Sequence, residues 1–229
     1  MFALVDKRIP VAAKEKLAAY FQIVEFFSEG IVYEAICGHP DIFFIRIGKT
    51  LIVAPNVPQK YINMLEENKV AYFLGEKPLG KRYPETASYN VSLNEFTLVH
   101  KLTITDKIVL NQSEALQKID VEQGYTRCNL LPLKNNHWIT SDKGIEKKLK
   151  ILNYSVLRVD SQDVVLPGAQ HGFFGGACGV LGSRIFIIGS LKYFSKRDCL
   201  RTFLEKIDYE IVELYDGPLF DGGSILFFE

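Results

Sequence analysis

Short apolar runs alternate along the chain with segments of helical periodicity, and their order is the strongest structural signal in the sequence. Residues 41–47 form a dense apolar run, a turn follows at 48–50, and residues 51–54 form a second run. Residues 61–67 carry apolar side chains at helical spacing, and residues 70–74 are again apolar. Because short apolar runs bounded by turn residues are typical of buried strands, this segment predicts the order strand, strand, helix, strand.

Two later segments predict the same order of elements. Ser141 or Asp142 is expected to cap the helix of the first segment and Ser195 the helix of the second, because short polar side chains accept hydrogen bonds from the free N–H groups at a helix start. The expected strands and helices are 129–133, 138–140, the helix 143–152 and 156–159, followed by 178–181, 185–188, the helix 196–206 and 209–214.

The segment between the first and the later units is less regular. Strands are predicted at 89–101 and 107–110, with at most a short helix at 113–118 between this unit and the next. Residues 75–89 are rich in Lys, Gly and Pro, which predicts a long surface loop.

The two ends of the chain together contain the elements of one further unit. Residues 2–5 and 22–27 predict strands on either side of a helix at 11–20, and residues 224–228 predict a strand with nothing after it. A sheet that takes strands from both termini leaves no open edge. We therefore expect an α/β fold, a five-bladed β/α propeller of ββαβ repeats in one domain over residues 1–229, with the last blade closed by both termini.

Glycines stand at the openings of several repeats, at Gly38, Gly124, Gly172 and Gly222. Recurring openings of this kind are typical of stacked or radial supersecondary units. In a closed ring the openings converge on the central axis, and the functional site is therefore expected there.

Composition and charge exclude several classes of function. The chain has 229 residues, with 27 Lys plus Arg and 27 Asp plus Glu. This balance favours neither nucleic acid nor a membrane surface as a partner, and no apolar run is long enough to span a bilayer. Without a secretory pattern at the N-terminus, we expect a cytoplasmic protein whose four cysteines are thiols. The spacings predict no metal and no cofactor, and they leave a homo-oligomer open.

Polar residues at the repeat openings are the first candidates for chemistry. His39 and Asp41 stand two residues apart, as a proton shuttle and a cation-binding carboxylate would, although Pro and Asp are equally typical of a plain turn. His171 beside a glycine is an alternative shuttle. Asp221 is expected to direct a carboxylate to the centre, with Ser224 as a further ligand contact.

Cys128 is the first candidate for a nucleophile. The neighbouring Arg127 is expected to lower the pKa of its thiol, or to bind an anion, and Asn129 is expected to contact a ligand. A buried cysteine is also a common small apolar residue. Cys178, which lies between glycines, is the second choice, and tight packing is favoured for it.

Two glycine-containing segments resemble a known superfamily. Residues 174–189, FGGACGVLGSRIFIIG, are similar to the Gly-Gly hairpin of the guanidine-modifying enzymes, and residues 221–227, DGGSILF, resemble the element that carries their nucleophile. These pentein enzymes are the arginine and agmatine deiminases, the dimethylarginine hydrolases and the amidinotransferases. The resemblance implies their five-bladed propeller over nearly the whole chain.

The resemblance also implies a chemistry that this chain lacks the residues to perform in the usual way. The family uses a thiolate that attacks the guanidinium carbon, a histidine that moves protons and carboxylates that hold the guanidinium. Leu226 and Phe227 stand where the family has His and Cys, and phenylalanine is no nucleophile.

Three functions follow as hypotheses. The leading one is a protein that binds a small polar ligand, guanidino or amino-acid-like, at the axis without the usual Cys chemistry. The second is an active hydrolase or deiminase that uses Cys128 or a histidine-activated water. The third is a propeller that binds a macromolecule and has no catalytic site, as in a ribosome-binding anti-association factor of the same fold.

Overall fold

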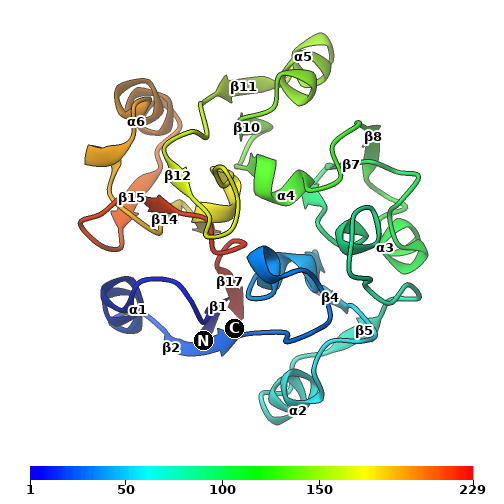
Figure 1. The fold of residues 1–229 in the computed structure, drawn as a ribbon. Coiled ribbons are helices and arrows are strands. Elements are labelled where there is room, and N and C mark those ends of the chain that lie inside the picture. The colour runs from blue at the N-terminus through cyan, green and yellow to red at the C-terminus, as the bar shows by residue number, and fades with distance from the viewer. Residues whose placement is uncertain (229) are drawn as a thin grey trace.

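Small mixed sheets, each with a helix on its outer side, surround a common centre in the computed structural model, which describes residues 1–228 (Figure 1). Within those residues the strands form five three-stranded sheets and one two-stranded sheet. In each three-stranded sheet the central strand pairs antiparallel with one neighbour and parallel with the other. A single ββαβ pattern therefore builds the ring.

Four of these sheets are continuous in sequence. Their elements are β3 (Phe44–Ile47), β4 (Thr50–Val53), α2 (Gln59–Glu67) and β5 (Tyr72–Leu74); β6 (Ser92–Leu93), β7 (Thr97–His100), α3 (Lys107–Gln112) and β8 (Gln117–Asp120); β9 (Leu130–Pro132), β10 (His137–Thr140), α5 (Lys143–Ile151) and β11 (Ser155–Arg158); β13 (Cys178–Leu181), β14 (Arg184–Ile187), α6 (Arg197–Lys206) and β15 (Glu210–Glu213).

The fifth sheet takes strands from both ends of the chain, as predicted. β1 (Phe2–Asp6) pairs antiparallel with β17 (Leu226–Phe228) and parallel with β2 (Gln22–Phe26), and α1 (Val11–Ala18) connects β1 to β2. The rings of Phe2 and Phe228 stack with their centroids 4.7 Å apart. Pairing of the two termini closes the ring, and Figure 1 shows both ends of the chain in this sheet.

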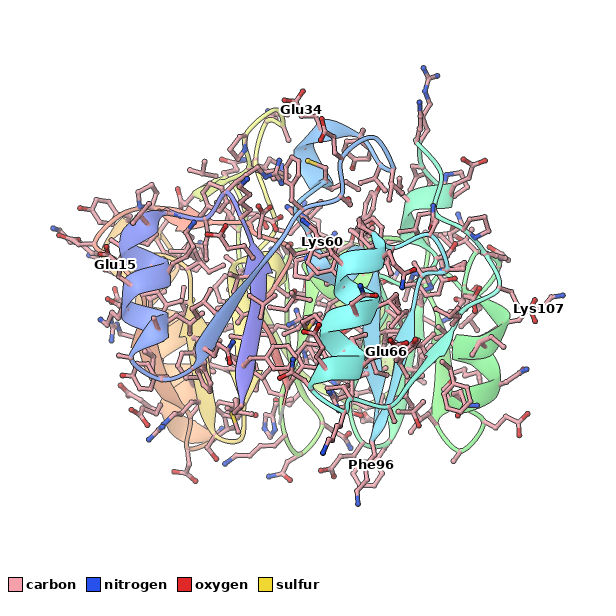
Figure 2. The ribbon with its side chains drawn as sticks, turned by 90° about the horizontal axis from the view of Figure 1, so that it is seen from below. Glu15, Glu34, Lys60, Glu66, Phe96 and Lys107 are labelled. Carbon is pink, nitrogen blue, oxygen red and sulfur yellow. The ribbon has the colours of Figure 1, made fainter. Side chains whose placement is uncertain are left out.

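The central strands are apolar because both of their faces are covered. Ile52, Trp138, Ile139 and Phe186 are all buried, between the helix of their own sheet and the adjoining sheets. The helices turn their polar faces outward (Figure 2). The apolar core therefore forms a ring, which leaves the centre to the turns that precede the first strand of each sheet. None of the helices in residues 1–228 is long and apolar enough to cross a bilayer.

The second unit is as regular as the others, which corrects the prediction for it. Residues 107–112 form the helix α3 instead of a strand, and residues 117–120 form β8 instead of the end of a short helix. The Asp106 side chain accepts a hydrogen bond from the Ile108 N–H and so caps α3. β-branched residues in the helix mimic a strand pattern, but the cap and tertiary packing decide the outcome.

Three further boundaries differ from the predictions. A 3-10 helix at Pro40–Ile42 precedes β3, and α4 (Thr126–Asn129) precedes β9, so residues 41–43 of the first predicted strand and Asn129 of the other lie before the strands. The last strand likewise begins at Leu226 and leaves Ser224 in the turn before it. The residue before α6 is Lys196 and no side chain caps that helix, so Ser195 is not its cap. The remaining pair, β12 (Val164–Val165) and β16 (Leu219–Phe220), was not predicted.

Candidate functional site

Polar side chains from different sheets meet where these turns converge. Asn90, Cys128 and Ser224 each stand two residues before the first strand of their sheet, and all three are buried. The Asn90 amide donates to Cys128 Sγ at 3.4 Å and to the Asp41 carbonyl oxygen at 3.2 Å, while its own oxygen accepts from the Cys128 N–H. The repeat thus brings together residues that are far apart in the sequence.

Asp41 joins this group through one of its carboxylate oxygens. Asp41 Oδ2 accepts a hydrogen bond from Ser224 Oγ at 2.7 Å and from Cys128 Sγ at 3.2 Å. Its other oxygen, Oδ1, is buried and has no hydrogen-bond partner in the described chain. Since a carboxylate in a protein interior normally has both oxygens satisfied, this oxygen is available to a ligand.

His39 and Asp221 form the second part of the cluster. The Asp221 carboxylate accepts from the Phe173 N–H at 2.8 Å and from the Gly223 N–H at 3.0 Å. His39 Nε2 lies 3.8 Å from Asp221 Oδ1, and among residues 1–228 neither ring nitrogen of His39 has a hydrogen-bond partner. A Cβ on Gly176 would lie 2.0 Å from Asp221 Oδ1, so the absence of a side chain there allows the close approach.

A cavity of about 680 Å³ opens above this cluster, and we call it the central cavity. His39, Cys128 and Asp221 lie on its floor, and Tyr33, Tyr125, His171 and Phe173 are among the side chains of its wall. Arg8 also lines the cavity, but its guanidinium is paired with Asp6 and donates to two backbone carbonyl oxygens. The floor therefore carries one buried carboxylate, Asp221, and a second, Asp41, lies behind the floor, where it accepts a hydrogen bond from Cys128.

Burial governs the ionisation of the cluster. Desolvation, together with the charges of Asp41 and Asp221, raises the pKa of the Cys128 thiol well above its usual range. This corrects the expectation that Arg127 would lower that pKa. Desolvation also raises the pKa of Asp221, although His39 and the two backbone N–H donors act in the opposite direction. Cys128 is therefore a protonated thiol that donates to Asp41 at neutral pH.

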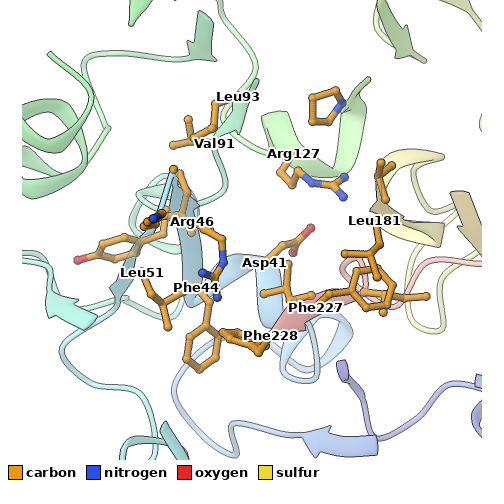
Figure 3. Close-up of a pocket in the computed structure, with 18 residues that line it drawn as sticks. Asp41, Phe44, Arg46, Leu51, Val91, Leu93, Arg127, Leu181, Phe227 and Phe228 are labelled. Atoms are coloured by element: carbon orange, nitrogen blue, oxygen red, sulfur yellow. The ribbon is translucent and has the colours of Figure 1, made fainter. Parts of the chain in front are cut away.

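Arg127 points to the opposite side of the molecule. Its guanidinium donates to the carbonyl oxygens of Gly175 and Cys178 and lines a different pocket, of about 510 Å³ (Figure 3). We call it the hairpin-end pocket, because the turn residues Gly48 and Lys49 between β3 and β4 border it. Phe227, at the position of the family nucleophile, lines this pocket and not the central cavity.

Of the other predicted site residues, His171 faces the central cavity, whereas Asn129 and Cys178 are packed in the interior. His171 lines the central cavity, and its Nδ1 lies 2.9 Å from the Gly172 carbonyl oxygen. Asn129 is buried beside the cluster, where its amide donates to the Tyr125 carbonyl oxygen and its side-chain oxygen accepts from Ser141. Asn129 lines neither pocket, so its place indicates a structural role. Cys178 is buried in β13, and burial raises the pKa of its thiol.

Sequence reasoning missed Asn90 and the aromatic wall of the cavity. Asn90 occupies the same place in its repeat as Cys128 and Ser224, so a correct register for the second unit would have identified it. The hydroxyl of Tyr125 forms hydrogen bonds with those of Tyr33 and Thr86, which fixes the wall. No local pattern marks these tyrosines, because they meet only across the fold.

Solved structures of guanidine-modifying enzymes have the same fold. SxtG, an amidinotransferase from Microseira wollei, is 14% identical, with a TM-score of 0.55, 88% of this chain covered and 74% of that chain. DDAH from Pseudomonas aeruginosa, a mutant complexed with citrulline, is 10% identical, with a TM-score of 0.54 and coverage of 93% and 91%.

The inosamine-phosphate amidinotransferase StrB1 from Streptomyces griseus is 12% identical, with a TM-score of 0.55 and coverage of 94% and 77%. These likenesses confirm the pentein fold that the glycine motifs indicated. No curated protein matches the chain. The model of a family of unknown function, DUF6873, matches residues 4–226, and the chain therefore belongs to the DUF6873 family.

Proposed function

We propose that this chain is a single-domain, five-bladed β/α propeller that binds a small cationic ligand of guanidino or amino-acid-like chemistry in the central cavity. Asp221 and His39 are its polar contacts, and Asp41 adds negative charge beneath them. His171 contributes to the wall. The C-terminal cysteine route of the guanidine-modifying enzymes is not used.

One observation carries this proposal. The buried Asp221 carboxylate and His39, whose ring nitrogens have no hydrogen-bond partner within the described residues, lie on the floor of a cavity of about 680 Å³, and the buried Asp41 carboxylate lies behind them. Burial of an uncompensated carboxylate is costly, so such a site favours a cation that pairs with it. A guanidinium forms paired, charge-assisted hydrogen bonds with carboxylates, and it fits a cavity of this size. The solved neighbours, which include an amidinotransferase and a DDAH complexed with citrulline, support the ligand class.

A second candidate is an enzyme that uses Cys128. The 3.2 Å contact between Cys128 Sγ and Asp41 Oδ2 supports it, because the carboxylate is placed to accept the thiol proton. The raised pKa of Cys128 opposes it. We therefore expect alkylating reagents near neutral pH to modify the exposed Cys199 about 100-fold faster than Cys128, since thiolate and access control the rate. Faster labelling of Cys128, measured by mass spectrometry, would favour the enzyme.

The proposed function is tested by thermal unfolding with arginine, agmatine, citrulline, creatine-like compounds and amino acids. At a concentration about 100-fold above Kd, a ligand adds ~2.7 kcal/mol to the free energy of unfolding. We expect a guanidino compound to raise the Tm by roughly 5–10 °C. If no compound in the panel shifts the Tm, the proposal is wrong.

Three variants locate the binding site. Asp221→Asn and His39→Gln are expected to abolish the shift, and His39→Gln is the structurally milder change because no hydrogen bond of the described chain involves its ring nitrogens. Arg127→Gln, in the hairpin-end pocket, is the matched control and is expected to keep the shift. Loss of the shift in the control and its survival in the other two would place the ligand elsewhere.

A further inference from the structure

Two residues on the floor of the central cavity and one directly behind it bring metal-binding atoms together. His39, Asp41 and Cys128 each offer one ligand atom, and these atoms lie within 4.8 Å of one another. All three side chains are at most 3% exposed. They come from the turns before two different sheets, so the metal-binding group cannot be recognised from the spacing of residues in the sequence.

The unsatisfied atoms of the cluster point to a missing partner. In residues 1–228, both ring nitrogens of His39 and Oδ1 of Asp41 are buried without a hydrogen bond. Each buried polar atom that lacks a partner costs roughly 1–3 kcal/mol. Three such atoms at one place are costly for folding alone, and a bound cation would satisfy one ring nitrogen of His39 and the free oxygen of Asp41 together.

The mixed donor set selects the class of metal. Thiolate and imidazole ligands suit zinc and similar transition metals, whereas magnesium and calcium prefer oxygen alone. We propose that His39, Asp41 and Cys128 bind one divalent transition metal ion of the zinc class, with an open coordination position toward the central cavity. A structural zinc site normally has four protein ligands, so three ligands beside a cavity indicate a site that also binds water or a ligand atom.

Asp221 supports the orientation that this site requires. His39 Nε2 faces Asp221 Oδ1 at 3.8 Å, which leaves Nδ1 for the metal. A histidine ligand commonly donates its other N–H to a carboxylate, which fixes its tautomer and orientation. Two backbone N–H groups hold Asp221 in place for this contact. A metal bound at Nδ1 would therefore complete a series of carboxylate, histidine and metal.

Binding of the metal changes the protonation of the cluster. Cys128 gives its thiol proton to solvent, its sulfur becomes a thiolate ligand, and the hydrogen bond to Asp41 is lost. The charges of the thiolate and of Asp41 then balance those of the metal. Metal–ligand bonds are about 2.0–2.3 Å long, so the widest separation in the cluster has to shorten by roughly 1 Å. Asp221 remains available to a cationic ligand above the metal.

The test is a titration of the purified full-length chain with Co²⁺ and Zn²⁺ after treatment with a chelator. We expect one ion per chain, a thiolate-to-cobalt absorption band, and release of a proton on binding in weakly buffered solution. Cys128→Ser is expected to abolish the band, and His39→Gln and Asp41→Asn to weaken zinc binding at least about 10-fold. Asp41→Asn retains an acceptor for Ser224 and Cys128, and is therefore expected to fold.

The exposed Cys199 gives the matched control, because Cys199→Ser removes a thiol outside the cluster. No cobalt–thiolate band in the wild type, or a band that survives Cys128→Ser and disappears in Cys199→Ser, would overturn the proposal. The guanidino panel is repeated on the chelator-treated protein. A ligand shift there without metal binding disproves the metal site alone, and metal binding without any ligand shift disproves the proposed ligand alone.

Discussion

The two pockets at the centre of the ring differ in charge and in the origin of their residues. The central cavity lies at the end where the turns before the first strands meet, and its floor is acidic. The hairpin-end pocket has Arg46, Lys49 and Arg127 with aromatic side chains such as Phe227 (Figure 3). Figure 2 shows the two ends from the side, with Glu34 of the cavity rim at one edge and Phe96 in a hairpin turn at the other.

This difference teaches that neighbouring residues can serve opposite ends of the ring. Arg127 and Cys128 are adjacent in α4, yet one lines the hairpin-end pocket and the other the central cavity. Asp41 lies between the two and also borders the hairpin-end pocket. The cation site proposed at the acidic end and the hairpin-end pocket at the other end are therefore separable by single substitutions.

The largest loss of stability is expected when a side chain is added at Gly176, just before β13, and Gly182, in the turn after β13, gives the comparison. Gly176→Ala would place a Cβ 2.0 Å from the carboxylate of Asp221, which cannot move without losing its backbone donors. We expect this variant to lose about 3 kcal/mol or more of the free energy of unfolding. Gly182→Ala, in the hairpin turn with a φ of +58° and open space around it, is expected to lose ~1 kcal/mol.

Chemical denaturation of both variants measures this contrast. Equal losses would show that the acidic end is no more tightly packed than the hairpin turns. A stable Gly176→Ala with a normal unfolding transition would contradict the position that the structure gives to Asp221.

The second comparison concerns the loss of stability in acid, which we expect to come from His100 in the surrounding sheets and not from the acidic end. His100 is buried in β7, where Nε2 lies 2.8 Å from the Gly124 carbonyl oxygen and Nδ1 2.7 Å from Thr105 Oγ1. Burial lowers its pKa from 6.5 to about 4. Between these pH values the unfolded chain binds more protons than the folded chain, so stability falls as the pH falls, by up to ~3 kcal/mol.

Denaturation at several pH values checks this prediction with His100→Gln as the variant. The variant is expected to be less stable at neutral pH and to lose most of the pH dependence between 6.5 and 4. An unchanged pH dependence would assign acid sensitivity to other groups, such as those of the cluster.

The third comparison is between the effects of Asp41 and Arg127 on the affinity for the ligand. Asp41→Asn removes a negative charge from behind the floor of the central cavity while it keeps the shape of the side chain. We expect the affinity for a guanidino ligand to fall about 10-fold, which corresponds to ~1.4 kcal/mol. Arg127→Gln is expected to change the affinity less than about 2-fold, because Arg127 points away from the cavity. Calorimetric titration measures both, and a larger loss in Arg127→Gln would reverse the assignment of the two ends.

The smallest effect is expected at Phe227. Its ring contacts those of Phe21 and Phe186, with centroids 4.9 and 5.3 Å away, and it is only partly buried. Phe227→Ala is therefore expected to cost ~1–2 kcal/mol of stability and to leave ligand binding unchanged. A strong loss of binding without a loss of stability would return the C-terminal position to the functional site.

The repeat was predictable because short segments of the sequence, by themselves, indicate its strands, turns and helices. Apolar runs and turn residues predicted the order of elements in three units and the shared sheet of the two termini, which the pairing of β1 with β17 confirms. The second unit was not predictable in the same way, because Ile108, Val109 and Leu110 look like a strand. Their helical state depends on the cap at Asp106 and on packing against the ring.

The site was predictable only as far as the repeat could place it. The approach of His39 to Asp221 follows from the convergence of the openings. The pKa of Cys128 does not, because it depends on burial and on carboxylates from other units. The direction of Arg127 depends on the short helix α4, which the strand predicted from residue 129 concealed.

The most direct test of the central claim is a crystal structure of the full-length chain with the guanidino compound that raises the Tm most. We expect the guanidinium to lie in the central cavity, with an N–H donor within hydrogen-bond distance of the Asp221 carboxylate. A ligand found in the hairpin-end pocket beside Arg127, with the central cavity free of it, would overturn the proposed binding site.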